Sequence, residues 1–543
     1  SNLKYSFVNS LDSSESIAAT LASYMHFDRD PETINYLYNS FDNISAEDIQ
    51  RIANKYFIDE NRTTVTLSAL DKIADFEQEV SLNTAVTQLN TKSVQPRKAQ
   101  FTVLDKTNDS PLIDVNFLFY TGAAADPEGK KGTAALMARM LTQGGSQTRS
   151  YQDIQKDLYP LAGQFSSQLD KEMISFTGRV HKDNATQWYQ LISDQLLHPG
   201  WREDDFKRLK KELIDGIQSG LKSSNDEELG KEVLYSKIYQ GHAYENFNSG
   251  DLSDLAAITI EDVKAFYAAQ LTQAKLHLGM TGAMPSDLKA QLMTDLTALP
   301  VGDEKRLNIA KAPVLKGHHA TIVEKNAQST AVSFGFPIDT IRNDKDWAAL
   351  WLVRSYFGEH RSSNSYLYQQ IRQARGMNYG DYSYIEYFPR GMFQTKPDAN
   401  LGRSSQIFQV WLRPLRSNND AHFATRAALY ELDKLIENGM SEKDFQATRN
   451  YLTNYAPQLV ASQDQQLGYA LDSEFYQTEE FVKYVREQFA KLSLADVNRV
   501  IKENLQTDDI QYVFISGDGE DMKKRLLSEQ VSPLKYNSEK PAE

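Results

Sequence analysis

Three stretches of the chain repeat one order of polar and hydrophobic positions. They read ISAEDIQRIANKYF from Ile44, ITIEDVKAFYAAQL from Ile258 and LSLADVNRVIKENL from Leu492. In each, the first residue is followed by Ser or Thr and then by an Asp with Ile or Val after it. Hydrophobic residues continue from there at helical spacing. A polar break and a run rich in β-branched residues follow, which predict a turn and a strand. The pattern therefore predicts the same helix and strand three times.

The spacing of these copies indicates large modules. Successive copies lie more than two hundred residues apart, far wider than the repeats of a solenoid. We interpret each copy as the end of a module. The first copy comes too early to close a whole module, so the sequence predicts that a preceding module is represented only by its tail.

Strands and helices follow one another inside each interval without the regular alternation of a parallel sheet. Predicted strands are FTVLDK (101–106), LIDVNFLFY (112–120), EMISFTGRV (172–180), ATIVEK (320–325) and TAVSFGF (330–336). Predicted helices cover 132–141, 150–162, 184–197, 203–221 and 345–357. We expect an α+β fold with two full modules, each an antiparallel sheet with helices packed on one side.

Polar stretches rich in Pro and Gly place the expected boundaries. The predicted division is a tail of a preceding module (1–70), a linker (71–94), a first full module (95–298), a second linker (299–314), a second full module (315–530) and a C-terminal tail (531–543).

Composition excludes several classes of function. The net charge of −14 argues against a nucleic-acid-binding protein, which normally presents a basic surface. The sequence contains no cysteine, which excludes disulfides, thiolate metal sites and a cysteine nucleophile. No apolar run is long enough to span a membrane. The absence of cysteine favours a bacterial periplasmic or secreted protein and also fits the cytoplasm.

Three motifs carry a resemblance to a known family. They are FYTGAAADPEGKKGTAALMARMLTQGGSQTRS (119–150), GHAYENFNSGDLSDLAAITIEDVKAFY (241–267) and SYLYQQIRQARGMNYGDYS (365–383). They resemble, in the same order, landmarks of the pitrilysin/insulinase family of zinc peptidases, the inverzincins. The resemblance extends from about residue 3 to 530.

The resemblance also implies where catalytic residues would stand. Active members carry His-x-x-Glu-His on the helix after the first Gly-rich turn, with a distal Glu as third protein ligand. These positions fall on Ala135, Ala138, Arg139 and Gly216. Ala and Gly have no ligating atoms, and Arg is a fixed cation. We therefore expect no zinc in this chain, with the zinc held by a missing N-terminal half.

The other histidines and their neighbours do not form a convincing metal site. His318 and His319 are adjacent and would point to opposite faces of a strand. Glu359 precedes His360, and His181, His198 and His242 are isolated in sequence. A surface or hydrogen-bonded histidine is the expected role for each.

One motif of the second module matches a functional pair. Active relatives use an Arg and a Tyr seven residues apart to hold the substrate and stabilise the oxyanion, and Arg372 and Tyr379 match this spacing. Arg375 is a nearby alternative with the wrong spacing. Without the flanking motifs, the same residues would suggest an Arg at a helix C-terminus and a Tyr packed in a sheet. With them, the resemblance implies a substrate-contact pair.

Two further segments have alternative interpretations. The aromatic run YGDYSYIEYF (379–388) could line a peptide groove, although strand packing is the favoured explanation. The acidic run SSNDEELGKE (223–232) predicts a solvated helix start capped by Asn225 or Asp226.

The resemblance implies a function for the whole chain. It would be the C-terminal, non-zinc-binding half of a zinc metalloendopeptidase that hydrolyses peptides in a two-halved chamber. Its partners would be a catalytic half on the same polypeptide or a separate catalytic subunit, and a peptide substrate. The alternatives are an inactive partner subunit and a structural scaffold. The chain alone is expected to cleave nothing.

Overall fold

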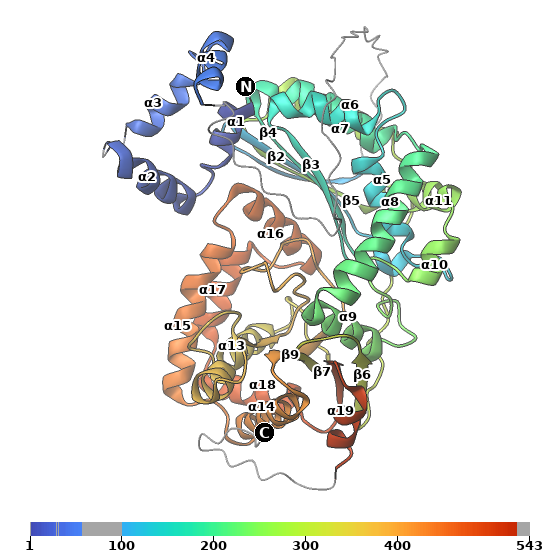
Figure 1. Ribbon diagram of the computed structural model, residues 1–543, viewed down its shortest axis with the longest axis vertical. Helices are drawn as coiled ribbons and strands as arrows, with labels where there is room; N and C mark the ends of the chain where they lie inside the picture. Colours follow the sequence, from blue (N-terminus) through green and yellow to red (C-terminus); the bar gives the residue numbers. More distant parts are fainter. Residues whose placement is uncertain (1, 29, 31, 57–99, 529–543) are drawn as a thin grey trace.

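The computed structural model describes residues 2–28, 30, 32–56 and 100–528 (Figure 1). The strand expected after the first repeat copy, the linker 71–94 and the tail 531–543 lie outside these residues. Among the residues described, no helix has the length and hydrophobicity needed to cross a lipid bilayer.

Two five-stranded sheets with the same topology form the centre of the molecule. The first has the order β1-β5-β2-β4-β3 and the second β6-β10-β7-β9-β8. The strands of the first sheet are β1 Thr102–Thr107, β2 Leu112–Phe119, β3 Gln164–Leu169, β4 Ile174–His181 and β5 Leu276–Gly282. Those of the second are β6 His318–Glu324, β7 Thr330–Ile338, β8 Gly380–Tyr384, β9 Gln406–Leu415 and β10 Ile510–Ser516.

The expected α+β class is confirmed, with one addition. In each sheet the outermost pair, β1 with β5 and β6 with β10, is parallel, whereas the other pairs are antiparallel. The parallel partners are the first and last strands of a module. The pairing therefore joins the two ends of each module, a contact that local sequence patterns do not encode.

Helices surround the sheets. The N-terminal segment forms α1 Asn2–Asn9, α2 Ser14–Asp28, α3 Thr33–Ser40 and α4 Ala46–Tyr56. The first module contains α5 Thr133–Gln143, α6 Tyr151–Leu158, α7 Ala185–Leu197, α8 Glu203–Asp215, α9 Asp226–Ile238, α10 Leu252–Ala257, α11 Ile260–Gln270 and α12 Ser286–Asp295. The second contains α13 Trp347–Gly358, α14 Asn418–Asn438, α15 Glu442–Leu459, α16 Gln463–Tyr476, α17 Phe481–Lys491, α18 Leu494–Asn504 and α19 Gly519–Leu526.

The three repeat copies share one helix-capping motif. In α11 the side chain of Thr259 accepts from the backbone N–H of Asp262, whose carboxylate accepts from the N–H of Thr259. Ser493 and Asp496 form the same capping box in α18, and Ser45 and Asp48 in α4. The Ser/Thr and Asp of the pattern thus satisfy backbone donors at three helix starts.

Each sheet packs its hydrophobic face on helices of its own module. One core gathers Val115, Phe117 and Phe176 with α5, α7, α8 and α11. The other gathers Phe334, Phe336 and Val410 with α13, α14, α15, α17 and α18. The predicted helices and strands of both modules are present within a few residues of their expected limits.

The opposite face of each sheet is covered by a helix of the other module, so the two modules exchange one helix each. Helix α9 of the first module packs on β7 and β10 of the second, and α16 of the second module packs on β2 and β5 of the first (Figure 1). At Gly279 in β5, an added Cβ would come within 3.0 Å of Leu467 and Leu471. Glycine thus allows α16 to approach the sheet closely.

The exchange corrects the expectation for the acidic run 223–232. Asn225 does cap α9, because its side chain accepts from the N–H of Glu228. Ser223 and Ser224 are exposed, but the helix that follows them is largely removed from solvent. Glu227 and Lys231 are buried, Arg413 pairs with Glu227, and the Lys231 ammonium lies 3.8 Å from the Trp411 ring centroid. The charges of this run belong to the contact between the modules, where partners compensate their burial.

Candidate functional site

The helix that would carry the zinc motif is α5, and it has no ligating side chain at the matching positions. Ala135 and Ala138 are buried at 6 % and 3 % exposure. Arg139 is half-buried and lines a cavity of about 1150 Å³. Helix α5 contacts β3 and α8. At the positions matched to the zinc motif, α5 therefore carries two methyl groups and one guanidinium.

Gly216 lies where α8 ends and a π-helical segment, Gly216–Ser223, begins. One turn earlier, the charge of Glu212 acts on Arg139. Residues four apart share a helix face, so this observation supports the placement of Gly216 on the side of α8 that faces Arg139. A Cβ added at Gly216 would meet no atom within 4 Å.

The residues present do not fit a zinc ion. No group of three His, Asp or Glu side chains in the described part of the chain is arranged to bind a metal. Several histidines have other partners: His242 Nε2 contacts the carbonyl oxygen of Ala310, His318 Nδ1 the hydroxyl of Tyr512, His319 Nε2 the carbonyl of Lys316, and His360 Nε2 the carbonyl of Gln394.

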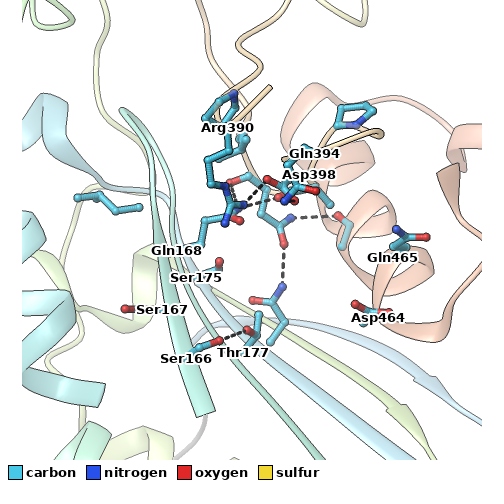
Figure 2. Close-up of a pocket in the computed structure, with 18 of the residues that line it drawn as sticks. Ser166, Ser167, Gln168, Ser175, Thr177, Arg390, Gln394, Asp398, Asp464 and Gln465 are labelled. Carbon is cyan, nitrogen blue, oxygen red and sulfur yellow. Dashed lines mark hydrogen bonds and ion pairs between the residues drawn. The ribbon is translucent and has the colours of Figure 1, made fainter. Parts of the chain in front are cut away.

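A cavity of about 1150 Å³ lies between the two modules. One wall is the polar face of the first sheet, with Ser166 and Gln168 from β3 and Ser175 and Thr177 from β4 (Figure 2). The segment 387–401, carrying Arg390, Gln394 and Asp398, and the start of α16, with Asp464 and Gln465, form the other walls. The cavity is thus lined mainly by neutral polar groups and paired charges.

Asn400 fixes the segment 387–401 against the cavity floor. Its side chain accepts from Asn116 Nδ2 at 2.8 Å and donates to the carbonyl oxygen of Gly468 at 3.0 Å. Its backbone adopts a φ of 61°, a left-handed conformation that Asn tolerates better than most residues. One buried amide therefore joins β2, α16 and the segment.

A second buried contact holds the modules together beside the cavity. The Arg403 guanidinium binds Asp170 through Nε at 2.8 Å and Nη2 at 2.5 Å, with both side chains almost fully buried. Glu172 accepts from the backbone N–H of Ser404 at 2.5 Å and from the hydroxyl of Tyr244. The turn between β3 and β4 is therefore fixed by residues of the second module.

Arg372 and Tyr379 lie together, away from the cavity. Arg372 is on the π-helical segment Tyr368–Gln373, and Tyr379 immediately precedes edge strand β8. Arg372 Nη1 donates to the carbonyl oxygen of Tyr379 at 2.9 Å, and its guanidinium carbon lies 5.0 Å from the Tyr379 ring centroid. Tyr379 is 68 % exposed. Neither residue lines the cavity.

The neighbours of this pair have structural roles. Arg375 is buried, donates to the carbonyl oxygen of Gln370 and lies over Phe423. Tyr382, Tyr384 and Phe388 of the aromatic run are buried with Trp411, and the Tyr384 and Trp411 rings stack at 4.3 Å. Packing against the second sheet, the favoured explanation, therefore holds for these three residues, whereas Tyr387 of the same run lines the cavity.

Asp381 in β8 gives the fold a pH dependence. Its side chain is fully buried, and burial raises its pKa to about 7, although Asn378 donates to it at 2.6 Å. Because the folded state holds this proton more tightly than the unfolded chain, stability decreases as pH rises from about 4 to 7.

We expect Asp381→Asn to reduce the decrease in the free energy of unfolding between about pH 4 and 7. The free energy of unfolding at pH 8 should rise by at most about 4 kcal/mol, the cost of about three pKa units. Urea unfolding at several pH values measures it, with Asp339→Asn, 79 % exposed in side chain, as control. An unchanged slope would show that Asp381 titrates alike in both states.

Sequence reasoning missed the cavity wall. Polar residues alternate with apolar ones along β4, where Ser175, Thr177 and Arg179 face away from the core that holds Ile174 and Phe176. This alternation was available as a sign of a polar sheet face. The contributions of segment 387–401 and α16 had no such sign, since they come from the other module.

Comparison with known proteins agrees with the two-sheet α+β fold. Residues 102–250 match the family described as insulinase (peptidase family M16), and residues 257–452 match the peptidase M16 inactive domain. The chain belongs to the M16 peptidase family. Within that family, the match of residues 257–452 supports an inactive member.

M16 relatives of this chain are distant in sequence. An uncharacterized zinc protease of Rickettsia bellii is 20% identical over 306 residues, which are 55% of this chain and 72% of the relative. The non-peptidase homolog YmxG of Helicobacter pylori is 19% identical over 428 residues, 76% of this chain and 90% of the relative.

M16 structures share the fold. The crystal structure of a peptidase M16 inactive domain from Pseudomonas fluorescens has a TM-score of 0.66 at 20% identity, covering 78% of this chain and 97% of that one. The periplasmic protease PqqL of Escherichia coli has a TM-score of 0.61 at 11% identity, covering 80% of this chain and 48% of PqqL.

Proposed function

We propose that this chain is the peptide-binding, non-zinc-binding half of an M16 zinc metalloendopeptidase. The observation that carries the proposal is the cavity of about 1150 Å³. It lies against edge strand β3 and the former catalytic helix α5, where Ala135 and Ala138 replace reactive groups. The site keeps the room and polarity to hold a peptide and lacks the groups that would cleave it.

Edge strand β3 is the element on which a peptide would bind. It pairs with β4 on one side, and no strand of the described part of the chain pairs with its other side. An extended peptide can add to such an edge through backbone hydrogen bonds, which accept many sequences. The small polar side chains of Ser166 and Ser167 leave space beside the edge.

Arg372 and Tyr379 would act on a peptide bound by the zinc-carrying half. The Tyr379 hydroxyl would donate to the oxyanion of the scissile carbonyl, and Arg372 would bind a neighbouring peptide carbonyl. The exposure of Tyr379 and its contact with Arg372 support this role, since a pair outside the cavity can meet a second half.

The catalytic half would be on the same polypeptide or on a separate subunit. Exposed hydrophobic residues on helix α4 support the presence of such a partner. Ile49 and Ile52 are 63% and 44% exposed, whereas the equivalent Val263 and Phe266 of α11 are buried. The proposed division into modules at 95–298 and 315–530 follows the two sheets. A periplasmic location is proposed by analogy with PqqL.

Peptide binding to the chain alone tests the proposal. Ser166 faces the cavity and is exposed to it, so Ser166→Trp should fill the space beside β3 and weaken binding of a fluorescent peptide at least about tenfold. Ser166→Ala, which leaves the space open, should bind within about twofold of the unmodified chain. Fluorescence polarisation measures both. Equal affinities for Trp and Ala variants would refute binding at β3.

The second candidate is a scaffold without peptide binding, favoured by the likeness to the non-peptidase homolog YmxG. It predicts no saturable binding of extended peptides to the chain at all. The same titration therefore distinguishes the two functions.

A further inference from the structure

We infer that Arg139 binds a carboxylate of the peptide held in the cavity. The inference rests on the proposed peptide-binding function and adds a charge preference to it. In place of a metal ligand, the site would present a fixed cation to an acidic group.

The acidic side chains of the cavity are already engaged. Asp114 and Asp464 both pair with Arg179, at 2.6 and 3.2 Å. Glu228 pairs with Lys231 at 2.7 Å, Asp398 with Arg390 at 2.5 Å and Glu15 with Lys396 at 4.0 Å. Glu232 accepts from the Tyr387 hydroxyl at 2.7 Å. Three of the four lining cations, Arg179, Arg390 and Lys396, are paired in the same contacts.

Arg139 is the remaining cation. Within the described ranges, its guanidinium has no hydrogen bond and no ion pair, although it is half-buried. Burial lowers its pKa, and the charge of Glu212 opposes this only at a distance. Glu212 itself binds Arg208 at 3.1 Å. A partly desolvated cation without a bound anion is a favourable site for a carboxylate.

The position of Arg139 places this cation beside the proposed peptide strand. The preceding residue, Ala138, accepts from Ser167 Oγ of β3 at 3.4 Å through its carbonyl oxygen. A peptide along β3 would therefore pass near Arg139. Ala135 and Ala138 end at Cβ, so the guanidinium is the α5 group at these positions that can reach the ligand. Its planar fork matches a carboxylate with two parallel hydrogen bonds.

The carboxylate could be the C-terminus of the peptide or an Asp or Glu side chain. A peptide of alternating Thr and Val with an uncharged fluorescent label (a BODIPY dye) on its N-terminus separates these sources when prepared in three forms. The forms are the C-terminal acid, the C-terminal amide, and the amide with one central Glu. Fluorescence polarisation at low and at physiological salt gives the affinities.

We expect one or both carboxylate forms to bind about tenfold more tightly than the neutral amide, the typical effect of one charge-assisted contact. Arg139→Gln should remove this difference and leave the affinity for the amide unchanged. Arg139→Lys should retain part of it, since the charge remains without the fork. The matched control is Arg149→Gln, which removes an Arg paired with Asp157 outside the cavity.

Two results would overturn the inference. Equal binding of all three forms to the unmodified chain would refute the carboxylate preference and leave the proposed peptide-binding function standing. An acid preference that survives Arg139→Gln would place the carboxylate elsewhere. If no form binds, both the inference and the proposed function fail. Thermal unfolding of each variant confirms that the fold is retained, as expected for a side chain without bonds to break.

Discussion

A chain carrying Ala135→His, Ala138→Glu, Arg139→His and Gly216→Glu is expected to bind one zinc ion, whereas the unmodified chain binds none. Residues 135 and 139 are one turn apart on α5, so two histidines there would point to the same side. Gly216 follows the last turn of α8, where the charge of Glu212 acts on Arg139, and a Cβ added at Gly216 would meet no atom within 4 Å. Elemental analysis and competition with a chromogenic chelator measure the zinc.

The triple variant without Gly216→Glu is the matched control. With only two histidine ligands it should bind zinc at least about 100-fold more weakly, since even outer-shell changes cost 10–100-fold. Equal affinity of the triple and quadruple variants would mean that the distal ligand position is not residue 216. Zinc bound tightly by the unmodified chain would refute the loss of the site altogether.

Tyr379→Phe is expected to reduce peptide turnover by the assembled enzyme about 10²–10³-fold, the cost of one oxyanion donor. The effect should fall on kcat, because the hydroxyl would act when charge develops on the substrate carbonyl. Arg372→Ala should raise KM as well, since Arg372 would also bind the ground-state peptide. Steady-state hydrolysis of a quenched fluorescent peptide by this chain together with its zinc-carrying half measures both.

The control for Tyr379 is Tyr159→Phe, which removes the hydroxyl of another tyrosine of similar exposure, 70 %. It lies on the first module and should leave turnover unchanged. If Tyr379→Phe also leaves kcat unchanged, the pair has no role in catalysis, and the scaffold function gains support. Retained helical circular dichroism would confirm that neither change alters the fold.

Much of the fold could be predicted because its signals are local. The capping residues Thr259 and Asp262, and Ser493 and Asp496, recur with the same spacing because one carboxylate and one hydroxyl satisfy the same backbone donors. Helix and strand limits followed from the periods of hydrophobic residues. The pairing of β1 with β5 did not, because it joins residues that are distant in sequence.

The candidate site was predictable only in part. The predicted loss of zinc ligands at Ala135, Ala138, Arg139 and Gly216 follows from residue type and the family pattern, and it stays a prediction. The absence of a partner for Arg139 could not, because it depends on where Glu212 and Arg208 place their charges. The acidic run 223–232 was misjudged for the same reason: its partners Arg413 and Trp411 lie in the other module.

The sequence by itself determined the repeat, the helix starts, the α+β class and the chemistry that is missing from α5. These properties depend on residue type and on neighbours within a few positions. Only the tertiary structure decided that α9 and α16 are exchanged between the modules and that a cavity lies between them. It also separated Arg372 and Tyr379 from that cavity. Long-range packing sets these features, and the free energy of such contacts depends on which surfaces meet rather than on local pattern.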